Sequence, residues 1–152
     1  MKRRLILYRA KAKESNEWIY GDVIDHPTKR TRIRHFVNTQ YTGARFVEDP
    51  VLPDTVSEYT GKEDKKGKRI FEGDVLRFHY SFPDVTGTLL SGDEDYVVAW
   101  SKEQAGWYLY SSSYDEEDGL SGTDTLFEVV GNVYDNPDML KGRQKFLAFK
   151  TI

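Results

Sequence analysis

A row of arginines is the feature of this sequence that most directly suggests a chemistry. Lys29 begins a segment, 29–35, in which four positive charges fall within six residues. Residues two apart share one face of a strand, so the alternation predicts a basic face made by Arg30, Arg32 and Arg34. Such a face could follow the phosphates of a nucleic acid. The aromatic residues that could stack on bases beside it are Tyr8, Trp18, Tyr20 and Phe36.

The same arginines could instead pair with carboxylates of this protein. The net charge of −3 hides a strong asymmetry, because residues 1–50 carry eleven bases and six acids whereas residues 81–140 carry one base and thirteen acids. Segments of opposite charge attract one another within one chain or between subunits. Since nearby carboxylates compete with phosphate, we favour ion pairing over nucleic-acid binding, and we expect a homo-oligomer.

The carboxylates of residues 81–140 suggest a metal-assisted hydrolase as a second alternative. Two acidic runs, Asp93–Asp95 and Asp115–Asp118, offer the oxygen ligands that calcium prefers, but their spacing does not match an EF-hand. The spacing of the three histidines matches no local metal-ligand motif; they are His26, His35 and His79. The sequence has no cysteine, which excludes disulfides, thiolate metal sites and thiol catalysis. We therefore expect no metal, no cofactor and no catalytic residue, and we favour a binding protein over an enzyme.

Strands are the elements that must position these side chains. Aromatic residues make up 14% of the chain and glycine occurs 12 times, which favours strands joined by tight turns. Alternating or apolar runs predict strands at 5–10, 18–24, 30–35, 56–59, 68–71, 75–80, 88–90, 96–100, 106–110, 126–134 and 145–152. The stretch 41–54 contains a glycine and two prolines and is expected to be a loop, with one helical turn near 53–55. One short helix is expected at 136–140, with Asn136 as its cap and Pro137 at its first position.

Strand spacings near ten residues in the second half predict a mainly β fold that contains a small closed barrel of the SH3-like kind. We expect one domain over 1–152, with a β-rich N-terminal lobe over 1–60, the barrel-like part over 61–140 and a C-terminal strand extension over 141–152. No run approaches the ~20 apolar residues of a membrane span, so no membrane association is expected. The expected core residues of the barrel are Trp100, Val98, Phe78 and either Leu76 or Val75.

Two segments resemble the YopX-type proteins of phages and prophages. Residues 59–75, YTGKEDKKGKRIFEGDV, are similar to the family's block QYTGLKDKNGKEIYEGDIV. Residues 127–140, FEVVGNVYDNPDML, are similar to its block EVIGNIYENPELL. Shorter similarities lie at Trp18–Gly21 and Val97–Trp100. The sequence departs from the family at Glu58, where glutamine is usual, and at Lys62, where an apolar residue is common.

The resemblance implies a mainly β fold, a phage or prophage origin and a place in the cytoplasm of a bacterial host. It implies no activity, and no catalytic residue can be carried over to this chain. The predicted function is therefore that of a non-enzymatic accessory protein that binds macromolecules, with a host or phage protein as the expected partner. Nucleic acid is the first alternative, through Arg30, Arg32 and Arg34. The terminal run 145–152, if it lies on a sheet edge, would pair with a second copy of the chain.

Overall fold

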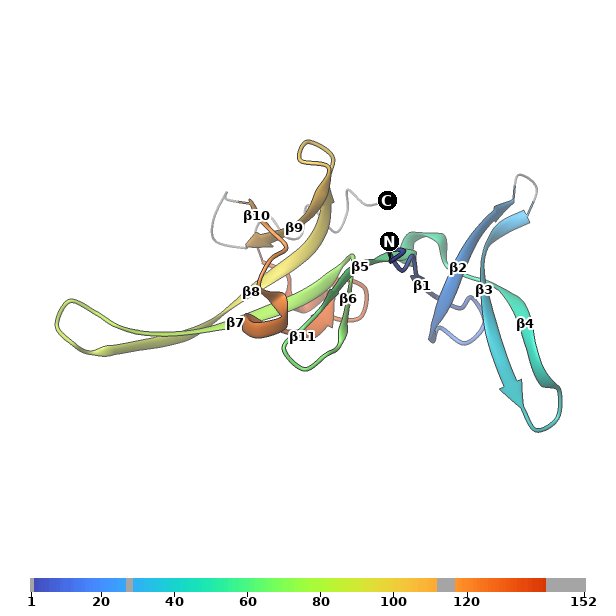
Figure 1. Ribbon diagram of the computed structural model, residues 1–152, viewed down its shortest axis with the longest axis horizontal. Helices are drawn as coiled ribbons and strands as arrows, with labels where there is room; N and C mark the ends of the chain where they lie inside the picture. The colour runs from blue at the N-terminus through green and yellow to red at the C-terminus, as the bar shows by residue number, and fades with distance from the viewer. Residues whose placement is uncertain (1, 27–28, 112–116, 142–152) are drawn as a thin grey trace. The chain divides into compact units, whose positions relative to one another are not determined.

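The computed structural model describes residues 2–26, 29–111 and 117–141 of the chain (Figure 1). Strands dominate these ranges, so the prediction of a mainly β protein is confirmed. The chain divides into two compact units, Met1–Tyr59 and Thr60–Ile152. The expectation of a single domain stays a prediction.

Two of the predicted features fall on residues outside the described ranges. These features are the terminal strand at 145–152 and the beginning of the acidic run at 115–118. None of the helices within the described ranges is long and apolar enough to cross a membrane.

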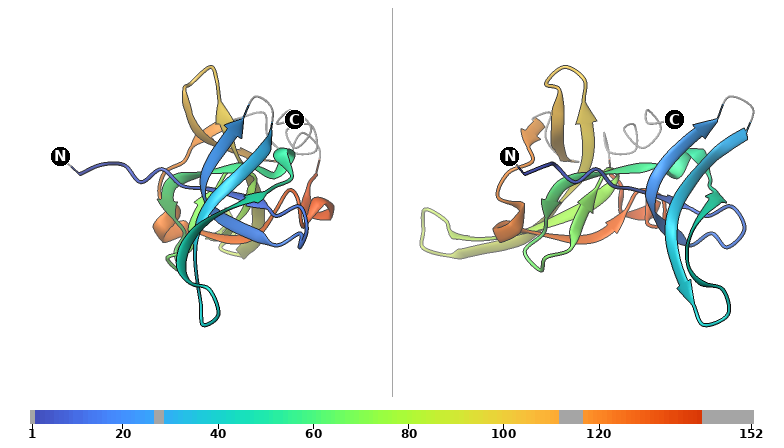
Figure 2. Two further views of the ribbon diagram at one scale, coloured as in Figure 1. Left: turned by 90° about the vertical axis from the view of Figure 1, so that its right-hand side faces the viewer. Right: turned by 45° about the vertical axis from the view of Figure 1, so that its right-hand side comes forward.

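The first unit is an antiparallel sheet in the order β4-β3-β2-β1-β5. Its elements are β1 Tyr8–Lys11, β2 Trp18–His26, β3 Lys29–Thr39, β4 Gly43–Pro50, the 3-10 turn η1 Pro53–Thr55 and β5 Ser57–Glu63. β5 pairs with β1 at its beginning and continues into the second unit. One side of the sheet packs around the buried side chains of Ala10, Ile33 and Val51. The hairpin of β3 and β4 extends away from this core (Figure 2).

Residues 43–50 form a strand where a loop was expected. β4 is the edge strand of the first unit and pairs with β3 from Gly43 to Pro50. A proline is tolerated in an edge strand because no neighbouring strand needs its missing N–H. Gly43 has a φ of 69° and supplies the left-handed residue of the β3–β4 turn. Two of the three residues that suggested a loop, Gly43 and Pro50, therefore mark the ends of a strand, and the third, Pro53, begins η1, which confirms the expected helical turn at 53–55.

The second unit contains a five-stranded antiparallel sheet in the order β10-β9-β8-β7-β11. Its elements are β6 Arg69–Phe71, which pairs with β5, and then β7 Asp74–Pro83, β8 Leu89–Ser101, β9 Gly106–Ser111, β10 Glu117–Gly119, α1 Thr123–Leu126, β11 Phe127–Asn132 and the 3-10 turn η2 Pro137–Met139. The expected closed barrel is wrong for the described residues, because β10 and β11 are separate edges of this sheet. Strand spacing did not reveal that β7 and β8 extend past their neighbours as a long hairpin (Figure 1).

The interior of the second unit confirms most of the predicted core. Leu76 and Val98 are buried in one cluster, and Phe78 packs against it. The prediction for Trp100 is wrong, because its side chain is 44% exposed. Trp100 lies one residue pair before the β8–β9 turn, where the core ends, and contacts the ring of Trp107 edge-on with centroids 5.1 Å apart.

The expected helix at 136–140 is only the single 3-10 turn η2. Asn136 precedes this turn, but its side chain makes no capping hydrogen bond. Its Oδ1 instead accepts a hydrogen bond from the backbone N–H of Asn132 at 3.2 Å. The asparagine therefore stabilises the loop after β11 rather than the start of a longer helix.

Candidate nucleic-acid interface

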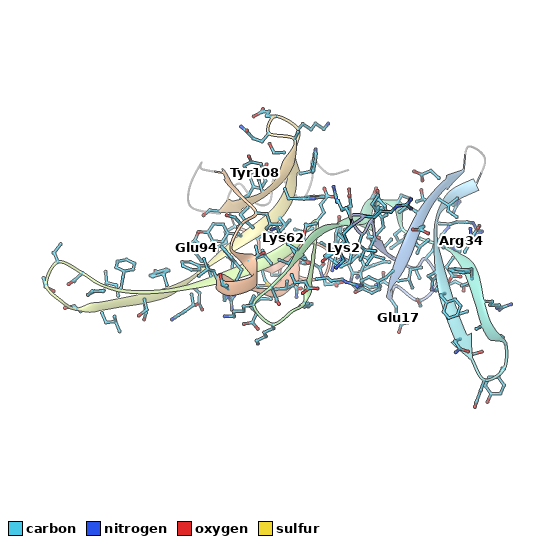
Figure 3. All side chains as sticks on the ribbon, in the orientation of Figure 1. Lys2, Glu17, Arg34, Lys62, Glu94 and Tyr108 are labelled. Atoms are coloured by element: carbon cyan, nitrogen blue, oxygen red, sulfur yellow. The ribbon has the colours of Figure 1, made fainter. Side chains whose placement is uncertain are left out.

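The strand that carries the arginines lies between two neighbours in the first unit. β3 pairs with β2 on one side and with β4 on the other, and residues paired across an antiparallel sheet share a face. Arg32 is paired with Pro50 of β4, and Arg34 with Glu48. Because Ile33 between them is buried in the core, the two arginines project from the opposite, outer side of the sheet. Figure 3 labels Arg34 on this strand.

Arg30 is separated from the other two arginines by an irregularity of the sheet. The register of β2 against β3 shifts after Ile24, so that Arg30 and Thr31 stand opposite one residue of β2. This is the pattern of a β-bulge, which interrupts the alternation of faces along a strand. The regular part of the predicted row is therefore a pair, Arg32 and Arg34.

Two exposed phenylalanines lie beside Arg34 on the outer side of the β3–β4 hairpin. Phe36 is paired with Phe46, and their ring centroids are 5.5 Å apart in an edge-to-face arrangement. Their side chains are 57% and 64% exposed. The guanidinium of Arg34 lies over the Phe46 ring, 5.1 Å from its centroid. We use the name outer face for the surface formed by Tyr20, which is 48% exposed on β2, and by Arg32, Arg34, Phe36 and Phe46.

The other aromatic residues considered for base stacking have structural contacts. Tyr8 packs against the buried cluster on the core side of the sheet. Trp18 is covered by cations of β1, since the Arg9 guanidinium lies 4.5 Å and the Lys11 ammonium 5.5 Å from the ring centroid. Trp18 lies on the same side of the sheet as Tyr20 but is covered, so only two of the four predicted stacking residues, Tyr20 and Phe36, are exposed on the outer face.

Phe46 is not among the residues predicted to stack on bases, because its segment was expected to be a loop. The local signal for a strand is weak, since Ala44, Arg45 and Phe46 alternate between apolar and polar but Val47 and Glu48 break the alternation. Phe46 reaches Arg34 only through the pairing of β4 with β3.

The outer face carries charges of both signs. Arg32 donates a hydrogen bond through Nη1 to the backbone carbonyl of Glu48 at 3.2 Å. Two exposed carboxylates, Asp22 and Glu48, are the paired neighbours of Arg34 across the sheet. Within the described part of the first unit, none of the three arginines forms an ion pair with a carboxylate. The guanidinium of Arg34 rests on an aromatic ring instead, and this leaves its charge available to a ligand.

Among the carboxylates of residues 81–140, the acidic run Asp93–Asp95 is divided between the two faces of the β7–β8 hairpin. Asp93 contacts His79, with 2.7 Å between Oδ1 and Nδ1, and Asp95 accepts two hydrogen bonds from the Arg77 guanidinium at 2.8 and 2.9 Å. Glu94 lies on the opposite face, so the run cannot converge on one cation. The described part of the chain contains no group of three His, Cys, Asp or Glu side chains that could hold a metal. The hydrolase stays a prediction without a site.

The two segments that resemble YopX proteins are built against each other in the second unit. Asp64 is 3% exposed, and its carboxylate accepts hydrogen bonds from the backbone N–H groups of Lys66, Lys68 and Val129, each at 2.9 Å. Burial raises the pKa of the Asp64 carboxyl, but these three hydrogen bonds outweigh burial and hold the pKa below its ordinary value. Asp64 therefore joins the β5–β6 turn to β11.

A second buried carboxylate fixes the turn between β6 and β7. Asp74 accepts a hydrogen bond from the N–H of Phe71 at 2.8 Å. Gly73, at a φ of 81°, donates its N–H to the carbonyl of Val98 and accepts from the N–H of Val133, both at 2.8 Å. The hydrogen bonds of the recognisable segments thus hold the second unit together.

Residues 7–141 of the chain match the family model of the YopX protein. The chain belongs to the YopX family. The match includes both segments on which the predicted resemblance rested, so that prediction is confirmed.

The YopX chain is also similar to a solved structure, the crystal structure of protein EF1440 from Enterococcus faecalis. The TM-score is 0.54 at 16% sequence identity, and the likeness covers 91% of the YopX chain and 100% of the other chain. At this identity the likeness concerns the fold alone. No curated protein matches the YopX chain.

Proposed function

We propose that this YopX chain is a non-enzymatic phage or prophage accessory protein that binds macromolecules in the cytoplasm of a bacterial host, and that its ligand is single-stranded nucleic acid on the outer face. The observation that carries the proposal is the cluster of Arg34, Phe36 and Phe46. Two exposed rings are in contact there, and a guanidinium that no described carboxylate neutralises lies over one of them. This reverses the preference for ion pairing that the charge asymmetry suggested.

The chemistry of the outer face suits a base that is not paired. Aromatic rings stack on the face of any base, and an arginine beside them adds a contact to the phosphate and a cation–π interaction. In a duplex the base faces are already stacked on one another, so exposed rings favour a single strand. The two phenylalanines also expose apolar surface that a bound base would cover.

Two arginines of one hairpin provide the first test. Arg34 lies on the outer face, whereas Arg45, paired with Val37, is exposed on the other side of the same hairpin. If Arg32 and Arg34 neutralise about two phosphates, log affinity for an oligothymidine strand falls with log salt with a slope near −1.4. We expect Arg34→Gln to reduce the steepness of this slope by about 0.7 and Arg45→Gln to leave it unchanged.

Fluorescence anisotropy of a labelled strand of about 12 nucleotides measures these slopes with the full chain. Equal effects of the two arginine substitutions would show that the outer face is not the site. The absence of binding by the unsubstituted chain at low salt would reject nucleic acid as the ligand.

Glu48 is expected to oppose nucleic-acid binding, because its exposed carboxylate neighbours Arg34 and repels phosphate. We expect Glu48→Gln to raise the affinity for the same strand about threefold at low salt, and less at high salt because ions screen the repulsion. Glu14→Gln, at another exposed acid of the first unit, is the matched control. A weaker affinity of the Glu48 variant would mean that the carboxylate itself contacts the ligand.

The charge asymmetry along the chain supports a second mode of binding. We propose that the chain forms a homo-oligomer and binds a host or phage protein, because its basic and acidic segments complement one another. Sedimentation at low and at high salt measures the assembly, and a monomer in both conditions would contradict it. We also propose that the second unit is related to SH3-like barrels, although the sheet formed by its described residues is open.

A further inference from the structure

An aromatic hollow of about 480 Å³ lies on the β7–β8 hairpin of the second unit. The register pairs Phe78 with Glu94 and Phe82 with Leu90, so these side chains share one face of the hairpin. Pairing continues to Leu76 and Tyr96 toward the base of the hairpin, which puts Tyr96 on the same face. The residues that line the hollow are Phe78, Tyr80, Phe82, Leu90, Ser91, Glu94 and Tyr96.

Two of the rings around the hollow contact neighbouring residues. The hydroxyl end of Tyr80 lies over Gly92, which has no side chain to displace it. The rings of Tyr80 and Phe82 are 5.7 Å apart, and Tyr96 meets Phe127 of β11 edge-on at 5.7 Å. These contacts place Tyr80 and Tyr96 against neighbouring residues at the two ends of the hollow.

A carboxylate that forms no ion pair with a cation of the described residues lies in this hollow. Glu94, labelled in Figure 3, is half-buried, and its Oε1 accepts a hydrogen bond from the hydroxyl of Ser111 at 2.6 Å. Its neighbours Asp93 and Asp95 contact a histidine and an arginine on the opposite face. No Lys, Arg or His among the described residues forms an ion pair with Glu94. A half-buried carboxylate is more stable with a cation beside it, and aromatic rings attract the same cation through their faces.

We propose that this hollow binds a lysine or arginine side chain in an extended segment of a partner protein. The charge is complementary, because residues 81–140 carry thirteen acids and one base, which favours a basic partner. The cation would approach Glu94, its methylene groups would contact Tyr80, and apolar residues on either side would cover Phe82 and Leu90, which are exposed. This site is independent of the outer face of the first unit, and it can be tested without nucleic acid.

The test uses the isotope-labelled full chain and two synthetic peptides that differ only in charge. One is acetyl-Gly-Leu-Arg-Leu-Gly-amide, and the other carries citrulline, the neutral analogue of arginine, in the middle. On titration with the arginine peptide we expect saturable changes in the amide NMR signals of Tyr80, Glu94 and Tyr96. The citrulline peptide should bind about tenfold more weakly, because it lacks the charged partner of the carboxylate.

Two substitutions on one strand separate the site from a general effect of negative charge. Glu94→Gln removes the carboxylate in the hollow and should lower the affinity for the arginine peptide about tenfold. Asp93→Asn, on the opposite face, should leave this affinity unchanged. The NMR spectra themselves report that both variants are folded. Equal binding of the two peptides, equal effects of the two substitutions, or signal changes only outside the β7–β8 hairpin would each overturn the proposal.

Discussion

Replacing Asp64 by alanine is expected to lower the free energy of unfolding by about 3–5 kcal/mol at neutral pH. The carboxylate is buried and accepts three backbone N–H groups, and a hydrogen bond to a charged group contributes about 1.5–3 kcal/mol. Alanine would leave these donors without their partner at the junction of the β5–β6 turn and β11. Urea unfolding followed by circular dichroism measures the change.

The residue before it in the chain gives a matched control. Glu63 is exposed, and Glu63→Ala should change the free energy of unfolding by about 0.5 kcal/mol or less. If the two alanine variants unfold at the same urea concentration, the carboxylate of Asp64 does not join the two segments.

The stabilisation by Asp64 is expected to decrease in acid. The folded state holds the pKa of this carboxyl below its ordinary value, so the unfolded chain binds the proton first as the pH falls. The stabilisation is complete above the unfolded pKa, near 4, and is lost as the pH falls through the lower folded pKa. The difference in stability between the unsubstituted chain and Asp64→Ala should therefore shrink in acid and stay constant above about pH 5.

Replacing both Phe36 and Phe46 by alanine is expected to weaken the binding of a single strand by about 1–3 kcal/mol for each stacked base. The two rings are more than half exposed, so their removal should cost the fold only about 1 kcal/mol. The slope of log affinity against log salt should not change, because the arginines proposed to contact phosphate remain. This loss of affinity at an unchanged slope distinguishes stacking from charge.

The control for the phenylalanine pair is Leu89→Ala, at an apolar residue of comparable exposure in the second unit. It should bind the strand as the unsubstituted chain does. If the variant that lacks Phe36 and Phe46 binds with full affinity, the two rings do not stack on bases, even if the arginine substitutions weaken binding.

Much of the fold could be predicted because it depends on local pattern. The period of two along β3 placed Arg32 and Arg34 on one face, and the apolar runs around Leu76 and Val98 became buried strands. The bulge at Arg30 could not be predicted, because the register of β3 is set by its pairing with β2. Trp100 was misplaced for a similar reason, since alternation gives the face of a residue but not where the core ends.

Only part of the candidate site could be predicted from the sequence. Its arginines are a strong local signal, but the partner of Phe36 comes from a segment that the turn residues Gly43 and Pro50 made look irregular. The role of Asp64 was hidden as well, because Val129, which it contacts, is far away in the chain. Contacts between distant segments determine both the candidate binding surface and the stability of the second unit.

The central claim is that single-stranded nucleic acid lies on the outer face, and photo-crosslinking tests it most directly. The full chain is mixed with an oligonucleotide that carries 5-iodouracil, irradiated and digested, and the linked peptides are identified by mass spectrometry. We expect crosslinks to the aromatic residues Tyr20, Phe36 and Phe46, and we expect these crosslinks to be lost when Arg32 and Arg34 are both replaced by glutamine. Crosslinks confined to residues 60–152, or no crosslink at concentrations where the strand is bound, would contradict the claim.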